Sequence, residues 1–177
     1  MTLDLSQRHR PVPDTSFRKC HPTIMRALIQ RVSSAEVTNS GQIVSSIGNG
    51  LLIFLGVSQN DNEDDATYVA NKVPTLRIFP DYENRFNYSA VDLGAELLVV
   101  SQFTLYANTR RGRRPDFIDA AKPEVAEELY EQFIKLLRIS GLKVASGKFQ
   151  TDMLVSLVNT GPVTIMIDSE DMKSSRH

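Results

Sequence analysis

The segment that decides the fold spans residues 96–104 and reads ELLVVSQFT. Its first half is a continuous apolar run, which predicts a strand of the kind buried inside a sheet. A second run of this type, LLIFLGV, occupies residues 51–57. Its β-branched and aromatic members favour a strand over a helix, and we expect this strand to be covered on both faces.

Further strands and two helices are predicted around these segments. Residues 61–65 are acidic and begin a helix that Pro74 ends. A second, amphipathic helix begins near Pro123 and is closed by Gly141. The remaining periodic or apolar stretches predict strands at residues 26–33, 42–47, 76–79, 142–149, 154–158 and 163–167. Strands outnumber helices and no repeat is visible, so we expect a single α+β domain with mixed or antiparallel β-sheets packed with two main helices.

This domain is expected to span residues 25–169, between an N-terminal extension at 1–24 and a polar C-terminal tail at 170–177. The extension lacks the apolar stretch of a secretory signal and contains three prolines. A disordered extension, a start placed upstream of Met25 and an organellar transit peptide remain its alternatives. No run of 18 apolar residues occurs, so no transmembrane helix and no membrane partner are expected.

Reactive side chains are almost absent from the body of the chain. Between Met25 and Ser169 there is no His, no Cys and no Trp, because Trp is absent from the chain and the other two types are confined to His9, Cys20, His21 and His177. A Ser-His-Asp or Cys-His arrangement needs an imidazole, and a tetrahedral zinc site needs Cys or His ligands. We therefore expect no metal site and no cofactor. The net charge is −1, so any contact with nucleic acid requires a local basic patch.

The first candidate site is the strand end at residues 101–104. Ser101, Gln102 and Thr104 supply hydroxyl and amide groups where a strand enters a polar loop. The backbone N–H groups around Phe103 and Thr104 are candidate donors to a ligand oxygen. The alternative is that these polar groups are only solvated or capping.

A second candidate is the segment at 159–164, which reads Asn-Thr-Gly-Pro-Val-Thr. Composition alone favours a plain hairpin turn between two strands, since Gly and Pro are typical turn residues. The alternative is a cis bond between Gly161 and Pro162, which would fix the direction of two carbonyl groups.

The third candidate is a group of four arginines around Gly112, namely Arg110, Arg111, Arg113 and Arg114. They form either a phosphate-binding patch or a solvated loop that pairs with the acidic residues of the second helix. The sequence leaves both alternatives open.

Four stretches resemble the D-aminoacyl-tRNA deacylase family, which hydrolyses D-amino acids from mischarged tRNA. They are MRALIQRVS at 25–33, VVSQFTLYA at 99–107, RRGRRPDF at 110–117 and MLVSLVNTGPVTI at 153–165. The resemblance runs in order from Met25 to about Ser169. It implies the fold of that family, a homodimer, a cytoplasmic location and a charged tRNA, carrying a D-amino acid or glycine, as the substrate.

The resemblance also implies roles for individual residues. Ser101, Gln102, Phe103 and Thr104 would line the catalytic pocket for the terminal adenosine and its amino acid. Thr104 would position the substrate rather than attack it, with the ribose 2′-hydroxyl of the tRNA helping to activate water. Gly161 and Pro162, joined by a cis bond, would enter the site of the partner subunit, where their carbonyls exclude an L side chain. Residues that would support this motif are Arg31, Asn159, Val163 and Thr164, and the four arginines would contact tRNA phosphates.

Two alternatives to this function remain. A sister class of the same fold carries the Gly-Pro bond trans and edits L-alanine on a non-cognate tRNA, but the retained Phe103 and Arg31 favour the D-specific class. A nucleic-acid-binding or replication-associated module would use the arginines without hydrolysis. Three positions depart from the family pattern: Pro74, Phe86 and Thr160.

Overall fold

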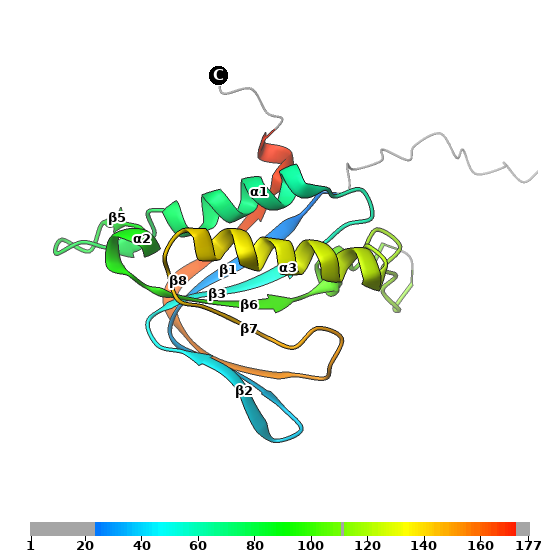
Figure 1. The fold of residues 1–177 in the computed structure, drawn as a ribbon, viewed down its shortest axis with the longest axis horizontal. Coiled ribbons are helices and arrows are strands. Elements are labelled where there is room, and N and C mark those ends of the chain that lie inside the picture. Colours follow the sequence, from blue (N-terminus) through cyan, green and yellow to red (C-terminus); the bar gives the residue numbers. More distant parts are fainter. Residues whose placement is uncertain (1–23, 111, 173–177) are drawn as a thin grey trace, which may run out of the picture.

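The computed structural model describes residues 24–110 and 112–172 and is built around one mixed β-sheet (Figure 1). Its strands run in the order β2-β1-β3-β6-β7, and β8 pairs with the remaining edge of β1. Strand β1 is antiparallel to its three neighbours, whereas β3, β6 and β7 are parallel. The strands are β1 (Arg26–Asn39), β2 (Gln42–Ile47), β3 (Gly50–Gly56), β6 (Glu96–Ser101), β7 (Val144–Ser146) and β8 (Leu154–Asp168). The expected α+β class with a mixed sheet is confirmed.

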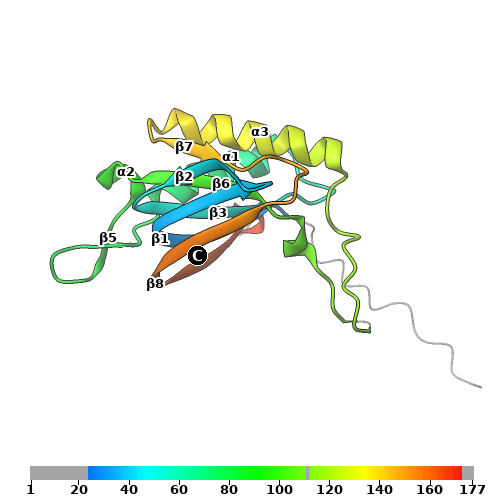
Figure 2. The same ribbon diagram turned by 90° about the horizontal axis from the view of Figure 1, so that it is seen from below.

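Two helices cover one face of the sheet and pack against each other (Figures 1 and 2). Helix α1 (Glu63–Lys72) begins at a capping box formed by Asn62 and Asp65, which satisfies free N–H groups of its first turn. Helix α3 (Pro123–Ile139) begins with proline, and Gly141 follows its end with a φ of +79°.

The smaller elements connect the sheet and the main helices. They are η2 (Val73–Thr75), β4 (Phe79–Pro80), β5 (Phe86–Tyr88), α2 (Ala90–Leu93), η3 (Phe103–Tyr106) and η4 (Ser169–Met172). Strands β4 and β5 pair as a separate hairpin. Within the described ranges, no helix is both long and apolar enough to cross a membrane.

The two apolar runs of the sequence form the centre of the sheet and are buried on both faces, as predicted. Ile53 and Leu97 face the core beneath α1 and α3. Leu52 and Leu98 point to the opposite face, into a second core completed by residues of β1, β2 and β8. Apolar residues are therefore required at every position of these strands, not at alternate ones.

Gly50 shows how closely the two central strands approach each other. A Cβ atom placed on this residue would lie 1.9 Å from the carbonyl oxygen of Glu96, its partner in β6. Only glycine fits this approach without moving the backbone of β3 away from β6.

The predicted pair of strands at 154–158 and 163–167 is wrong, and so is the hairpin turn between them. Residues 154–168 form one strand, β8, which pairs with β1 on both sides of Gly161. Two register shifts in β1, between Gln30 and Val32 and between Val32 and Ser34, absorb the irregular segment. The fourteen residues of β1 offer one continuous partner, so a local turn sequence becomes a bulge within a strand.

Other differences concern where elements end. The strand expected at 76–79 is limited to the two residues of β4, Phe79–Pro80, because residues 73–75 form the 3₁₀ turn η2 just before it. The strand expected at 142–149 is limited to Val144–Ser146. The strand that begins at Glu96 ends at Ser101, and the chain then turns into η3. The first strand extends beyond the predicted residue 33 to Asn39.

Candidate functional site

The segment at 101–104 forms a tight turn at the end of β6. The N–H of Gln102 donates to the carbonyl of Leu55 at 2.8 Å, which fixes the start of the turn on β3. The first hydrogen bond of the turn itself is donated by Leu105 to Gln102, at 3.2 Å. Among the described residues, the bonds that fix and close the turn do not use the N–H groups of Phe103 and Thr104, because these two groups precede the first bond of the turn.

The side chains of this turn are presented to solvent beside those N–H groups. Phe103 is 56% exposed, and Thr104 is also exposed. The side-chain amide of Gln102 donates to the hydroxyl oxygen of Thr104. This bond orients the Thr104 hydroxyl, so that its proton is free to be donated to a ligand.

An open cavity of about 520 Å³ lies next to the turn and is called here the aromatic cavity. Phe103 and Phe117 form part of its wall in an edge-to-face contact, with ring centroids 5.0 Å apart. Ser101 lines the cavity on the side of β6, and residues 149–153 close it on the side of β7 and β8. Its size and aromatic wall suit a flat aromatic group such as a nucleobase, which stacks through its ring face.

The sequence did not identify several residues of this wall. Phe117, Phe149 and Met153 line the aromatic cavity; Phe117 and Met153 lie at the ends of two stretches that carry the family resemblance, but none of the three was assigned to a site. Gly147 packs closely against this wall, because a Cβ atom placed on it would lie 2.8 Å from the sulfur of Met153. No periodicity marks these residues, because they come from loops that meet only in the folded chain.

The segment at 159–164 lies on β8, next to Arg31 of β1. The peptide bond between Gly161 and Pro162 is cis, and both residues are exposed. Arg31 is buried and donates to the carbonyl of Thr160 at 3.2 Å, to that of Gly161 at 3.4 Å, and to that of Ile78. Burial lowers the pKa of this guanidinium, which still remains a cation at neutral pH.

Two neighbours complete the support of this segment. The side-chain amide of Asn159 donates to the carbonyl of Arg31 at 3.1 Å and to that of Val163 at 3.0 Å. The Arg31 guanidinium also lies 5.7 Å from the ring centre of Phe86, in the β4–β5 hairpin. Val163 is buried in the core, whereas Thr164 is exposed and accepts from Gln30. The backbone around Gly161 and Pro162 is thus held from both sides.

The fold does not bring these two segments together within one chain. Ser101 lies level with Ala27 in the sheet, whereas Gly161 lies beside Arg31. Three strand spacings across the sheet and four residues along it correspond to about 20 Å. The two segments are therefore separate features of the described chain.

The arginine group is displayed on the loop between η3 and α3, which projects from the end of the sheet (Figure 2). Its base is closed by two hydrogen bonds between Asn108 and Asp116, at 2.8 and 3.1 Å. Arg110, Arg113 and Arg114 are exposed, and none of the ion pairs between described residues involves them. Arg111 lies outside the described residues.

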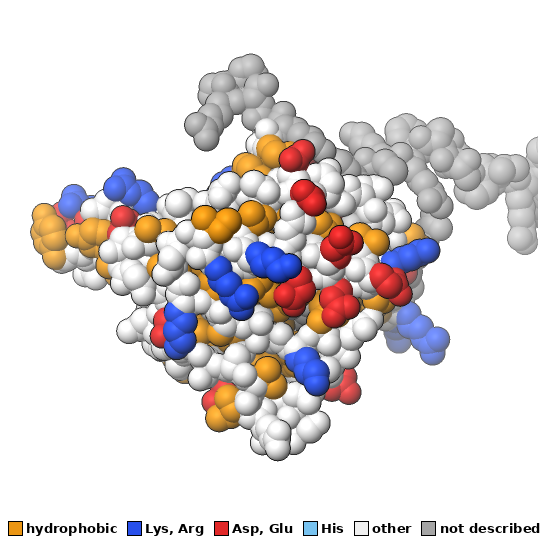
Figure 3. Space-filling model, viewed as in Figure 1, with side chains coloured by type: hydrophobic (Ala, Val, Ile, Leu, Met, Phe, Trp, Pro, Cys, Tyr) orange, Lys and Arg blue, Asp and Glu red, His pale blue; other side chains and the backbone are white. Residues whose placement is uncertain are grey.

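The acidic residues of α3 remain on the outer surface rather than pairing with these arginines. Figure 3 shows acidic side chains gathered over the first half of α3, and the exposed glutamates there are Glu124, Glu127, Glu128 and Glu131. Their negative charge makes this face unfavourable for a polyanion, whereas the arginine loop is favourable.

The described ranges contain no group of three or more His, Cys, Asp or Glu residues placed to hold a metal ion. Backbone N–H donors beside an open cavity are a feature that enzymes hydrolysing esters and amides use to stabilise a developing oxyanion.

Comparison with known proteins identifies the family to which the chain belongs. The family model described as D-Tyr-tRNA(Tyr) deacylase matches residues 28–168, and the chain belongs to this family of hydrolases. A D-aminoacyl-tRNA deacylase of Dehalococcoides mccartyi is 53% identical over 86% of this chain and 99% of its own length. A protein of the same name from Roseiflexus castenholzii is 55% identical over 86% of this chain and 98% of its own.

A solved structure, that of a c-Myc DNA Unwinding Element Binding Protein, is 38% identical to this chain. The match covers 80% of this chain and 97% of the other, with a TM-score of 0.75. The fold and the order of the segments are therefore shared over nearly the whole described chain.

Proposed function

We propose that this protein hydrolyses the ester bond between a D-amino acid and the terminal ribose of tRNA. The observation that carries the proposal is the pair of available N–H groups at Phe103 and Thr104 beside the aromatic cavity. Membership of the deacylase family supports it.

In the proposed complex the terminal adenine occupies the aromatic cavity and stacks on Phe103. The ester carbonyl then lies near the N–H groups of Phe103 and Thr104, which stabilise the negative charge that develops on its oxygen. Water attacks the carbonyl carbon, the bond to the ribose oxygen breaks, and that oxygen leaves with a proton. The products are a free amino acid and uncharged tRNA.

Proton transfer in this reaction does not require an internal histidine. The Thr104 hydroxyl, oriented by Gln102, positions the substrate, and the ribose 2′-hydroxyl assists the attacking water. Because an aminoacyl ester is already reactive, orientation of the substrate and the N–H donors are sufficient to accelerate its hydrolysis without a histidine base.

Selection of the D-amino acid is proposed to depend on a second copy of the chain. Gly161 and Pro162 are exposed, held by Arg31, and about 20 Å from the 101–104 turn of their own chain as measured along the sheet. In a homodimer they would enter the partner's site. A rigid backbone there would leave room for hydrogen but not for an L side chain. Glycine, with no side chain, would also be accepted, so glycyl-tRNA is a second proposed substrate.

The test is a deacylation assay with D-Tyr-tRNA and L-Tyr-tRNA, performed across protein concentrations that span dimer dissociation. We expect release of D-tyrosine alone, with activity lost as the dimer dissociates. Release of both enantiomers would contradict the proposed selection, and full activity of a monomer would contradict a shared site. The compartment proposed for this reaction is the cytoplasm, where aminoacyl-tRNA is consumed.

A second candidate function is nucleic-acid binding without hydrolysis. The exposed arginines 110, 113 and 114 and the name of the 38% identical structure favour it. The same assay separates the two functions, because a binding module would retain tRNA and release neither enantiomer.

A further inference from the structure

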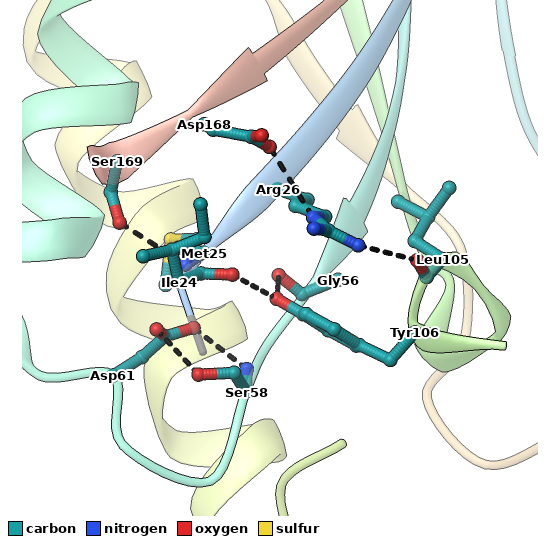
Figure 4. Close-up of polar contacts among 10 residues, drawn as sticks. All are labelled: Ile24, Met25, Arg26, Gly56, Ser58, Asp61, Leu105, Tyr106, Asp168 and Ser169. Atoms are coloured by element: carbon teal, nitrogen blue, oxygen red, sulfur yellow. Dashed lines mark hydrogen bonds and ion pairs between the residues drawn. The ribbon is translucent and has the colours of Figure 1, made fainter. Parts of the chain in front are cut away.

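Arg26 lies at the start of β1, outside the segments at 101–104 and 159–164, and connects three parts of the chain (Figure 4). Its guanidinium donates to the carbonyl of Leu105 at 3.1 Å. Its Nε lies 3.4 Å from Oδ1 of Asp168 at the end of β8, and Arg26 and Asp168 are also cross-strand partners. The fold thus places a cation, with its own counterion, against the 103–106 turn.

The carbonyl that Arg26 contacts belongs to the turn that carries the candidate oxyanion donors. Leu105 follows Thr104 directly, and its N–H closes the turn on Gln102. Gln102 is fixed to β3 through Leu55, so the peptides between them are held at the beginning by β3 and at the end by Arg26. A shift of the Leu105 carbonyl would change the direction of the Thr104 peptide.

Tyr106 provides a second attachment of the same turn. Its buried hydroxyl shares its proton between the carbonyl oxygens of Ile24, at 2.6 Å, and Gly56, at 2.9 Å. The Arg26 guanidinium lies 5.4 Å from the centre of its ring. A Cβ on Gly56 would lie 3.0 Å from this ring and 3.2 Å from the Gln102 carbonyl, so the turn rests directly on the backbone of β3.

The carboxylate of Asp168 is unfavourable at this half-buried position, which suggests that it is kept there to orient Arg26. Burial raises the pKa of its carboxyl group, and the nearby Arg26 only partly opposes this effect. Its Oδ1 accepts no well-aligned hydrogen bond among the described residues and contacts the Nε of Arg26 at 3.4 Å as an ion pair. A half-buried carboxylate with few partners contributes little to stability, which favours a role in directing the guanidinium.

We propose that Arg26, oriented by Asp168, is a positioning residue for deacylation that holds the Phe103 and Thr104 N–H groups in line with the ester carbonyl. This inference rests on the proposed function. It assigns to Arg26 an effect on the rate of the chemical step rather than on tRNA binding, since Arg26 contacts the turn from the side of β1.

The test compares Arg26→Met, Arg26→Lys and Asp168→Asn with the control Lys72→Met. Lys72 forms an ion pair with Asp171 at 3.4 Å, which likewise joins η4 to the earlier helix α1 but lies away from the turn. Deacylation of D-Tyr-tRNA is measured for kcat and KM, and thermal unfolding is measured for each variant.

For Arg26→Met we expect kcat to fall by about 10- to 100-fold with KM changed by less than about threefold, since a displacement near 1 Å can cost 10² in rate. Arg26→Lys retains a donor and should recover part of the loss, Asp168→Asn should show a smaller loss, and Lys72→Met should behave as wild type. Equal losses in Arg26→Met and Lys72→Met that follow their stability would overturn the proposal. If Arg26→Met does not fold, unchanged kcat in both Arg26→Lys and Asp168→Asn would overturn it equally.

A second measurement is independent of catalysis. Amide hydrogen exchange at Leu105 and Ala107, whose N–H groups are bonded within the turn to Gln102 and Thr104, should accelerate in Arg26→Met and not in Lys72→Met. If the wild-type protein hydrolyses no aminoacyl-tRNA, the proposed function fails, while this exchange result still decides whether Arg26 holds the turn. Unchanged exchange at both residues would show that it does not.

Discussion

Replacing Arg31 by methionine tests the link between the backbone at 160–162 and the selection of the D-enantiomer. The change keeps most of the side-chain volume but removes the donors to the carbonyls of Thr160, Gly161 and Ile78. The exposed carbonyls of Thr160 and Gly161 can bind water instead, whereas Ile78 is only 5% exposed. The Ile78 carbonyl is therefore the acceptor that is left unsatisfied.

The expected loss of stability follows from this difference. One buried acceptor without a partner costs about 1–3 kcal/mol, and the two solvated carbonyls add little. Removal of a buried guanidinium offsets part of the loss, because its own desolvation disappears. We expect the free energy of unfolding to fall by about 2 kcal/mol, which leaves an ordinary domain folded.

Replacing Arg31 should change the ratio of L-Tyr-tRNA to D-Tyr-tRNA hydrolysis more than it changes the rate of D-Tyr-tRNA hydrolysis. Without the Arg31 guanidinium the carbonyls of Thr160 and Gly161 lose a side-chain donor, so the backbone at 160–162 can move away from an incoming side chain even though Asn159 still supports the segment. We expect hydrolysis of L-Tyr-tRNA to rise relative to D-Tyr-tRNA by about 10-fold or more, which corresponds to about 1.4 kcal/mol of lost exclusion. Urea unfolding and the two deacylation rates measure both effects.

Arg85→Met is the matched control for this experiment. Arg85 lies in the same neighbourhood, in the β4–β5 hairpin, but its side chain is 65% exposed, and its ion pairs among the described residues are with Asp81 and Glu83. Its loss should change neither stability nor the ratio of the two rates by much. An Arg31→Met protein that is folded and keeps the full preference for D-Tyr-tRNA would refute the reasoning.

Three further predictions concern other parts of the molecule. Gly50→Ala places a Cβ 1.9 Å from the Glu96 carbonyl, so urea unfolding should show a loss of at least the ~1–3 kcal/mol typical of overpacking, whereas Gly48→Ala, with no atom within 4 Å, should be tolerated. Phe103→Ala removes a stacking surface worth about 1–3 kcal/mol, so KM for charged tRNA should rise about 10-fold or more with the melting temperature nearly unchanged; an unaltered KM would argue against adenine in the aromatic cavity. Backbone N–H bonds lower the pKa of Asp81, so this carboxylate stabilises the folded state above the ordinary carboxyl pKa, and that stabilisation is lost as the pH falls through the lowered pKa. The free energy of unfolding, measured against pH, should fall less in acid for Asp81→Asn than for the wild type. The same pH dependence in both proteins would contradict the assignment.

Local sequence patterns were sufficient to predict those elements whose conformation depends mainly on their own residues. The apolar run at 96–101 could be recognised as a buried strand because each of its residues needs a hydrophobic environment. Helix α3 could be recognised from its apolar periodicity, its proline start and Gly141. The turn at 103–106 could not, since its conformation depends on Leu55 and Arg26 from other strands.

By itself the sequence determined the α+β class, the buried central strands and the family, because these depend on hydrophobic pattern and on motifs read in order. Only the tertiary structure decided that residues 154–168 are one strand, since the long β1 supplies a partner on both sides of Gly161. It also assembled the aromatic cavity from loops distant in the chain and placed Arg31 against the Ile78 and Thr160 carbonyls. Such contacts join residues far apart in sequence, and no local propensity carries information about them.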